Sequence, residues 1–398
     1  MPNISIHNPK TKKAIVAGHF CLDLLPNLAT VPTGDFFQLF KPGHLLETGK
    51  MNVATGGAAS NTGISLTKLG IDTTVIARLG NDELSRIAQQ HLLRYIQADN
   101  VRLNFHDEDS TSYSVIINPP GIDRIFLHHP GANDAFSEKE VVFSDYPDHV
   151  LFHYGYPQLM KKMYQTEGQR LVSLFRNAKQ AALTTSMDTT LPDPSTEMGQ
   201  INWDRVLSKT LPYVDIFSPS FEEAFFMLKR EDYTHSIAEM PVEKKVAIAF
   251  ELCDKIIEYG ARIAFIKLGE IGGMVRVSHD LAAVDFGKAW YPALVEWKGR
   301  TLLAPSFTAK LVGTTGAGDA TIAGFLSSIL YESSLEEAIL MAMAVGGCKV
   351  EALDSVSAVR SWDETVQRIN QGWKQNNSRI KSLRGWFWQD DFGVLVKN

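Results

Sequence analysis

The feature that most constrains the fold is an alternation of short apolar segments with longer segments of helical periodicity. The apolar segments are residues 14–18, 74–77, 150–153, 184–187, 214–217 and 263–266. Between them, apolar residues recur three or four positions apart, as at Val246, Ala249, Leu252 and Ile256. Strands that alternate with helices predict an α/β fold, with a mostly parallel sheet covered by helices on both faces. The 398 residues, 44% of them hydrophobic, suffice for one large α/β domain or for two domains.

Near the end of the chain, a glycine-rich turn leads into a helix. The turn reads Thr314-Thr315-Gly316-Ala317-Gly318-Asp319, and apolar residues at helical spacing follow it. Gly316 and Gly318 allow backbone N–H groups to point at one spot at the positive end of the helix, which makes an anion-binding nest. A P-loop would continue with Lys and Ser or Thr, and a dinucleotide-binding turn would have a third glycine at position 321. Because this chain has neither, we expect a phosphate site of another kind.

Asp319 directly follows the two glycines and has two interpretations. An aspartate in the first turn of a helix is favourable through capping and the helix dipole alone. A carboxylate beside a phosphate nest can also take the proton of an alcohol that attacks a phosphoryl group, while the nest stabilises the developing charge. The surrounding Gly-Ala-Gly and a second glycine motif favour the catalytic interpretation.

The second motif lies near the beginning of the chain. Gly56-Gly57 precedes Ala58-Ala59-Ser60-Asn61 and a run of helical periodicity. The glycines can bring the backbone close to a ligand, and small residues leave room for it, although small residues also permit close helix packing. Asp23 follows the first predicted strand, and ligands of open α/β sheets lie beyond such strand ends. It is either a carboxylate that binds the hydroxyls of a polyol or a loop residue in a local turn.

Two segments do not follow the alternation of strands and helices seen in the rest of the chain. Residues 24–52 contain several prolines and glycines, which break any long helix. Residues 111–117 and 124–128 alternate enough to predict a hairpin around Pro119-Pro120-Gly121. His128 and His129 have no third ligand at metal-binding spacing, so we do not expect a metal there.

Composition argues against several classes of protein. The net charge of −6 and the lack of a basic face disfavour nucleic acid as a partner. No apolar run approaches the roughly 20 residues that a membrane-spanning helix needs, and the polar first 13 residues do not resemble a signal peptide. Cys21, Cys253 and Cys348 lie far apart and fit no metal spacing. We interpret them as buried thiols of a cytoplasmic protein.

Gly56-Gly57-x-x-x-Asn61 and Thr314-Thr315-Gly316-Ala317-Gly318-Asp319 resemble the two signatures of the ribokinase-like carbohydrate kinases, the phosphofructokinase B family. The resemblance extends from Ala14 to about Arg368. It implies a three-layer α/β/α fold with a central mostly parallel sheet and a small β lid over the sugar. The implied core is residues 1–23, 53–104 and 131–398, and the implied lid is residues 24–52 and 105–130.

The resemblance also implies a role for each matching residue. Asp319 matches the catalytic base, and Gly316, Ala317 and Gly318 match the anion hole for the transferred phosphoryl group. The sugar side is matched by Asp23, Gly56, Gly57 and Asn61. Glu223 matches the acid that organises Mg²⁺, and the nucleotide side is matched by Ser220, Lys267, Gly269 and Thr315.

The chain departs from the family pattern at two positions. Gly313 stands where the family usually has an aspartate, which is a ligand in relatives with a monovalent-cation site, so potassium activation is not expected here. Ser220 stands where an asparagine is usual. A hydroxyl can still bind a phosphate or a water, but it is shorter and lacks an amide, so nucleotide affinity or metal placement can differ.

We therefore expect an ATP- and Mg²⁺-dependent kinase that phosphorylates a hydroxyl of a small sugar. A nucleoside kinase of the same fold stays open, and an aromatic residue of the lid stacked on a base, such as Phe36, Phe37 or Tyr113, would favour it. A non-catalytic sugar-binding relative is a weaker alternative, supported only by Gly313 and Ser220. A nicotinamide-dependent oxidoreductase is weaker still, because no Gly-x-Gly-x-x-Gly follows the first strand. Lid edges that pair between subunits would make the protein a homodimer.

Overall fold

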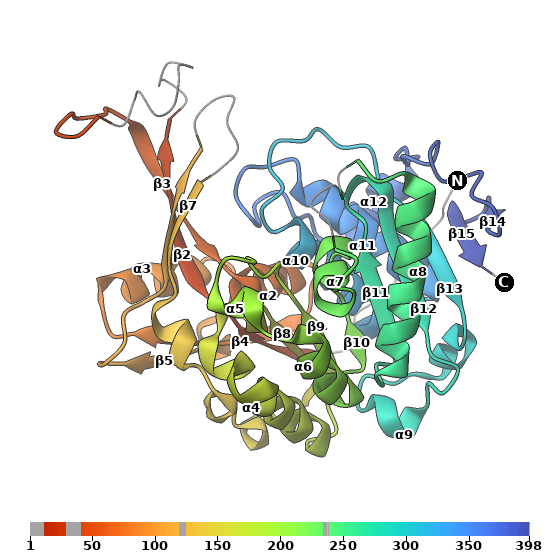
Figure 1. Cartoon of the computed structure of the whole chain (residues 1–398), viewed down its shortest axis with the longest axis horizontal. Coiled ribbons are helices and arrows are strands. Elements are labelled where there is room, and N and C mark those ends of the chain that lie inside the picture. The colour runs from red at the N-terminus through yellow and green to blue at the C-terminus, as the bar shows by residue number, and fades with distance from the viewer. Residues whose placement is uncertain (1–11, 29–40, 119–124, 234–236, 238, 398) are drawn as a thin grey trace.

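A computed structural model of the chain describes residues 12–28, 41–118, 125–233, 237 and 239–397, and an eleven-stranded sheet runs through it (Figure 1). Its strand order is β14-β15-β13-β12-β11-β10-β9-β8-β1-β4-β5. The strands from β11 to β5 pair in parallel, and those from β11 to β14 pair antiparallel. The predicted mostly parallel sheet is thus confirmed. The bounds are β1 (Lys13–Gly18), β4 (Asp72–Gly80), β5 (Val101–His106), β8 (His149–Gly155), β9 (Thr184–Asp188), β10 (Ile216–Phe217), β11 (Ile263–Lys267), β12 (Gly272–Val277), β13 (Thr301–Pro305), β14 (Phe387–Gln389) and β15 (Val394–Lys397).

Helices cover both faces of this sheet, as predicted. Strand β1 shows why: from Ala14 to Ala17 its side chains are apolar and alternate between the two faces, so Ile15 and Ala17 join one hydrophobic cluster while Ala14 and Val16 join another. Helices α4, α6, α7 and α8 contribute to the first cluster, and α2, α10, α11 and α12 to the second. The helices are α2 (Ala58–Lys68), α3 (Glu83–Leu92), α4 (Lys161–Gln180), α5 (Glu197–Gln200), α6 (Trp203–Thr210), α7 (Phe221–Leu228), α8 (Val242–Glu258), α9 (Ala283–Phe286), α10 (Ala317–Leu330), α11 (Leu335–Lys349) and α12 (Trp362–Asn370).

A separate four-stranded sheet projects from one end of the molecule, at the upper left of Figure 1. Its order is β3 (Gly49–Gly56), β2 (Cys21–Asn27), β6 (Tyr113–Ile117) and β7 (Ile125–His129). The antiparallel pairing of β6 with β7 confirms the predicted hairpin, whose turn at residues 119–124 lies outside the described residues. The sheet is consistent with a lid. Strand β2 of the small sheet begins at Cys21, three residues before the implied lid segment 24–52. Strand β5 of the large sheet extends to His106, so residues 105 and 106 of the second implied lid segment belong to the large sheet.

The end of the chain completes the edge of the large sheet opposite β5. Strand β15 pairs antiparallel with β13, and β14 pairs with β15 (Figure 1, right). Val394 and Leu395 are fully buried there. Trp388 lies on β14, so the Trp-rich end of the chain is part of the large sheet. Within the described part of the chain, no helix is long and apolar enough to cross a lipid bilayer.

Candidate active site

The geometry of the two glycine motifs comes from the helices that they open. Gly316 is the N-cap residue of α10 and Gly57 that of α2, and their φ angles are +78° and +85°. A side chain is strained at such angles, and a Cβ atom on Gly57 would lie 2.4 Å from the main-chain oxygen of His19. Helices α2 and α10 pack against each other, so the two motifs, about 260 residues apart in sequence, meet in space.

Asp319 lies where these two helices meet, and its side chain is fully buried. The Asn61 amide donates a hydrogen bond to its Oδ2 atom over 2.9 Å. The Tyr156 hydroxyl donates to its Oδ1 atom over 2.9 Å, and the Thr62 hydroxyl does so over 3.5 Å. Burial raises the pKa of Asp319, and these donors and the Lys267 charge oppose that rise. A carboxylate held by these donors has a fixed orientation.

Asp23, the second predicted site carboxylate, lies on the small sheet. The structure places it within strand β2, so the alternative of a loop residue in a local turn is wrong. The Cys21 thiol contacts its Oδ1 atom at 3.4 Å, and its Oδ2 atom lies 2.3 Å from where a Cβ atom of Gly56 would be. Gly56 is therefore required for the close approach of this carboxylate. Burial raises the pKa of Asp23 to about 6.

On the other side of Asp319, a buried ion pair underlies the predicted phosphate nest. The Lys267 Nζ atom lies 2.6 Å from Oδ1 of Asp188, and 3.3 Å from where a Cβ atom of Gly318 would be. Burial alone would lower the pKa of Lys267, but the carboxylates of Asp188 and Glu223 outweigh it and raise that pKa. A protonated lysine thus lies against the first turn of α10, where it adds positive charge to the helix N-terminus.

Ser220 and Glu223 form the beginning of α7 next to this ion pair. The Ser220 hydroxyl accepts from the Glu223 N–H, and the Glu223 carboxylate accepts from the Ser220 N–H over 2.8 Å, which is a capping box. Ser220 also forms a parallel bridge with Lys267. Gly269, with a φ of +62°, faces open space, and Thr315 is half-buried in the turn before α10. The structure therefore places Ser220, Glu223 and Lys267 next to one another.

Three residues of this region were not among the predicted site residues. Tyr156 and Asp188 each lie at or just past the carboxyl end of a strand, β8 and β9. His19 follows β1, is 3% exposed, and neither of its ring nitrogens has a hydrogen-bond partner among the described residues. Its ring centre is 5.5 Å from that of His128 and 6.3 Å from that of Tyr156. Strand-end position is the signal that could have identified them.

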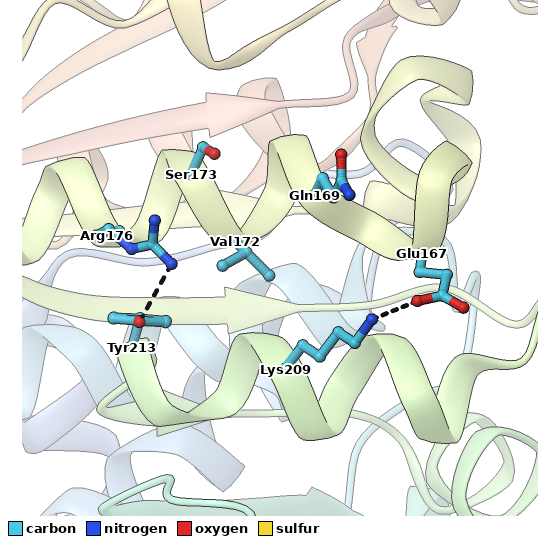
Figure 2. Close-up of a pocket in the computed structure, with 7 residues that line it drawn as sticks. All are labelled: Glu167, Gln169, Val172, Ser173, Arg176, Lys209 and Tyr213. Carbon is cyan, nitrogen blue, oxygen red and sulfur yellow. Dashed lines mark hydrogen bonds and ion pairs between the residues drawn. The ribbon is translucent and has the colours of Figure 1, made fainter.

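A surface hollow elsewhere does not overlap with this region. It has a volume of about 470 Å³ and lies between α4 and α6, where Lys209 pairs with Glu167 and Arg176 donates to the Tyr213 hydroxyl over 3.3 Å (Figure 2). None of the residues that line it is a predicted site residue.

The fold and the site are those expected of an α/β phosphotransferase, with an aspartate directly after a glycine-rich turn. Comparison with known proteins agrees with this class. Residues 29–361 match the family model described as pfkB family carbohydrate kinase, and the chain belongs to that family. It is a kinase that transfers a phosphoryl group to an alcohol.

Relatives and solved structures show the same likeness. The chain is 24% identical to the probable fructokinase-7 of Arabidopsis thaliana over 91% of its own length and 94% of that protein's. It is also 24% identical to the ribokinase of Haemophilus influenzae, over 82% and 91% of the two chains. The structure of Arabidopsis thaliana ribokinase complexed with ribose and ATP matches with a TM-score of 0.63, at 17% identity, over 90% and 98% of the chains. That last match shows the ribokinase fold.

Proposed function

We propose that this kinase transfers the γ-phosphoryl group of ATP to a hydroxyl of a small carbohydrate, with Asp319 as the base. The observation that carries the proposal is the buried Asp319 carboxylate at the beginning of α10, held by Asn61 and Tyr156. A carboxylate has about four lone-pair positions. Within the described residues Oδ1 accepts two hydrogen bonds and Oδ2 one, so Oδ2 keeps a position for a substrate hydroxyl.

The acceptor sugar would lie between the small sheet and α2. Asp23 offers carboxylate oxygens there, and the Asn61 Oδ1 atom is buried with no partner in the described part of the chain. Both can accept hydrogen bonds from sugar hydroxyls, and His19 adds two further unpaired ring nitrogens. Burial lowers the pKa of His19 to about 3, so this ring is neutral and can both donate and accept. Such a set of groups suits a polyol.

In the transfer step, Asp319 takes the proton of the acceptor hydroxyl as its oxygen bonds to the γ-phosphorus. The bond between that phosphorus and the β–γ bridging oxygen breaks, and ADP leaves. The N–H groups of Gly316 and Gly318 and the nearby Lys267 ammonium would stabilise the charge on the transferred group, whereas the Ala317 N–H already donates to the Thr314 oxygen over 3.0 Å. Positioning and charge stabilisation are the main requirements of phosphoryl transfer.

The residues on the nucleotide side also fit Mg²⁺ carried by ATP. Mg²⁺ prefers oxygen ligands and keeps several waters, so one or two carboxylates beside the phosphates are enough. Glu223 supplies one such carboxylate, and Asp188 has a buried Oδ2 atom without a hydrogen-bond partner among the described residues. When bound, Mg²⁺ would neutralise negative charge on the ATP phosphates.

We also propose that the protein is a homodimer through its small sheet. Strand β7 is an edge of that sheet, and Phe126 and Leu127 on it are 51% and 55% exposed. Among the described residues no further strand pairs with β7, and exposed apolar side chains such as Leu127 on a sheet edge favour pairing with a second copy. Light scattering with size-exclusion chromatography should give the dimer mass, and Phe126→Lys should give the monomer. A monomeric wild-type protein would refute this proposal.

The test of function is ATP consumption with Mg²⁺ against pentoses, hexoses, sugar acids, sugar phosphates and nucleosides. Turnover with a sugar and formation of its phosphate ester would support the proposal. Turnover with nucleosides alone would replace the sugar by a nucleoside; of the aromatic residues suggested for base stacking, Tyr113 lies on β6, and Phe36 and Phe37 lie outside the described residues. No turnover, together with sugar binding in a thermal-shift assay, would favour the non-catalytic alternative.

A further inference from the structure

Lys349, the last residue of α11, is the only fully buried lysine among the described residues. Its ammonium group donates to the main-chain oxygen of Gly313 over 2.8 Å and to that of Ala352 over 3.3 Å. Burial of an ammonium ion is costly unless oxygen atoms replace its water shell. A lysine near a helix C-terminus is favourable through the dipole, but the Gly313 oxygen belongs to a different segment, 36 residues away.

The two carbonyl groups belong to the loops that carry the predicted phosphate nest. Gly313 lies three residues before Gly316, and the N–H groups of Val312 and Gly313 both donate to the Val350 oxygen, over 2.8 and 3.2 Å. A Cβ atom on Gly316 would lie 2.8 Å from the main-chain oxygen of Ser355. The 312–316 turn is therefore packed on residues 350–355, and the Lys349 ammonium joins the two segments.

The same place has no room for a side chain at position 313. A Cβ atom on Gly313 would lie 2.9 Å from the Ala352 oxygen, so an aspartate there would force the backbone to move. Main-chain carbonyl oxygens are also the ligands that hold K⁺ in proteins, and an ammonium group carries the same charge and is close to K⁺ in size. Here the oxygens that could face such an ion already bind the chain's own ammonium group.

We propose that Lys349 is a built-in cation that fixes the turn before α10, so that the enzyme needs no monovalent metal ion. Lys349 is thus a positioning residue that acts through the Gly313–Gly316 turn. The proposal rests on the proposed function insofar as this turn holds the phosphates of ATP.

The first test needs no variant. Wild-type turnover and ATP affinity are measured in KCl and in choline chloride at the same ionic strength, about 0.1 M. We expect the same values in both salts. A strong dependence of either value on K⁺ would overturn the proposal, because it would require a cation site that Lys349 does not fill.

The second test is Lys349→Ala, which leaves the Gly313 and Ala352 oxygens without their donor. In choline chloride we expect the KM for ATP to rise on the order of tenfold. KCl, NH₄Cl or methylammonium chloride should partly restore it, since each supplies a small cation to the same oxygens. A variant with wild-type KM for ATP, or a defect that none of these cations relieves, would contradict the proposal.

Lys68→Ala is the matched control. The Lys68 ammonium donates to the oxygens of Val356 and Ser357, both over 2.9 Å, in the same loop but on its half-exposed side. We expect it to keep the wild-type KM for ATP in both salts. Direct ATP binding and thermal unfolding with and without KCl are measured for each protein as well. These readouts need no acceptor, so they test Lys349 even if no sugar turns over and the proposed function fails.

Discussion

At the scale of the residue, Tyr156 is one of the groups that oppose the effect of burial on the pKa of Asp319. Its hydroxyl donates to the Asp319 carboxylate over 2.9 Å and favours the ionised form. The proposed base acts when deprotonated, so kcat/KM should fall as the pH falls through the pKa of Asp319. Tyr156→Phe removes a donor and raises that pKa, so the acid limb of the kcat/KM profile should shift to higher pH.

The control for that variant is Tyr154→Phe, two residues earlier on β8. Its hydroxyl contacts the Met160 sulfur at 2.9 Å and does not touch Asp319. Its acid limb should match that of the wild type. An unshifted limb in Tyr156→Phe would show that the tyrosine does not tune the base.

The ionised Asp23 carboxylate, which is proposed to bind the acceptor, should lower the free energy of unfolding. Its folded pKa of about 6 lies above the ordinary value of 3.8, so ionisation of this carboxyl costs free energy in the folded state. The cost is nearly absent at pH 3, where the carboxyl is protonated in both states, grows as the pH rises, and is complete above about 6. Asp23→Asn should therefore raise the free energy of unfolding by up to about 3 kcal/mol at pH 7 and leave it nearly unchanged at pH 3.

Urea unfolding at the two pH values measures this effect, and the KM for the acceptor should rise in the same variant. An asparagine variant that is less stable than the wild type at pH 7 would be evidence against a strained Asp23 carboxylate.

At the scale of the element, strand β3 ends in a glycine that makes room for Asp23. A Cβ atom on Gly56 would lie 2.3 Å from the Asp23 Oδ2 atom, so Gly56→Ala should displace the carboxylate. We expect a higher KM for the acceptor, on the order of tenfold, with an unchanged KM for ATP. Gly49→Ala, at the other end of β3, is the control, because its new methyl group would meet only the Asn27 side chain. Equal effects on both substrates would mean that the strand, and not the pocket, was damaged.

The sequence predicted the long elements well and the short ones poorly. Val246, Ala249, Leu252 and Ile256, whose spacing predicted a helix, all lie buried on the 17-residue helix α8. The edge strands β5, β14 and β15 were missed, because three to six residues carry too little periodicity to show which strand they pair with.

The candidate site was likewise predicted only in part. Asp319 and Asn61 were predicted separately, and the structure joins them by a hydrogen bond. Tyr156 and Asp188 were missed because a tyrosine or aspartate after a strand is common in loops, and only the packing of α2, α10 and β9 brings them to Asp319 and Lys267. The roles of all these residues stay predictions.

At the scale of the whole molecule, the C-terminal strands stabilise an edge of the sheet far from the chemistry. Leu395 on β15 is fully buried, and Leu395→Ala should lower the free energy of unfolding by about 2 to 4 kcal/mol. Since the site lies elsewhere, kcat and KM at low temperature should not change. Phe387 on β14 is 58% exposed, and Phe387→Ala should cost far less. A large loss of activity in folded Leu395→Ala would show that this edge is coupled to the site.

The most direct test of the central claim is the rate of phosphoryl transfer by Asp319→Asn, with the best acceptor from the panel. Asparagine keeps the shape of the side chain and removes the base. We predict that ATP binding persists while kcat falls by roughly 10²- to 10⁴-fold, which corresponds to about 3 to 5 kcal/mol in the barrier. A variant that binds ATP and turns over at nearly the wild-type rate would contradict the assignment of Asp319 as the base.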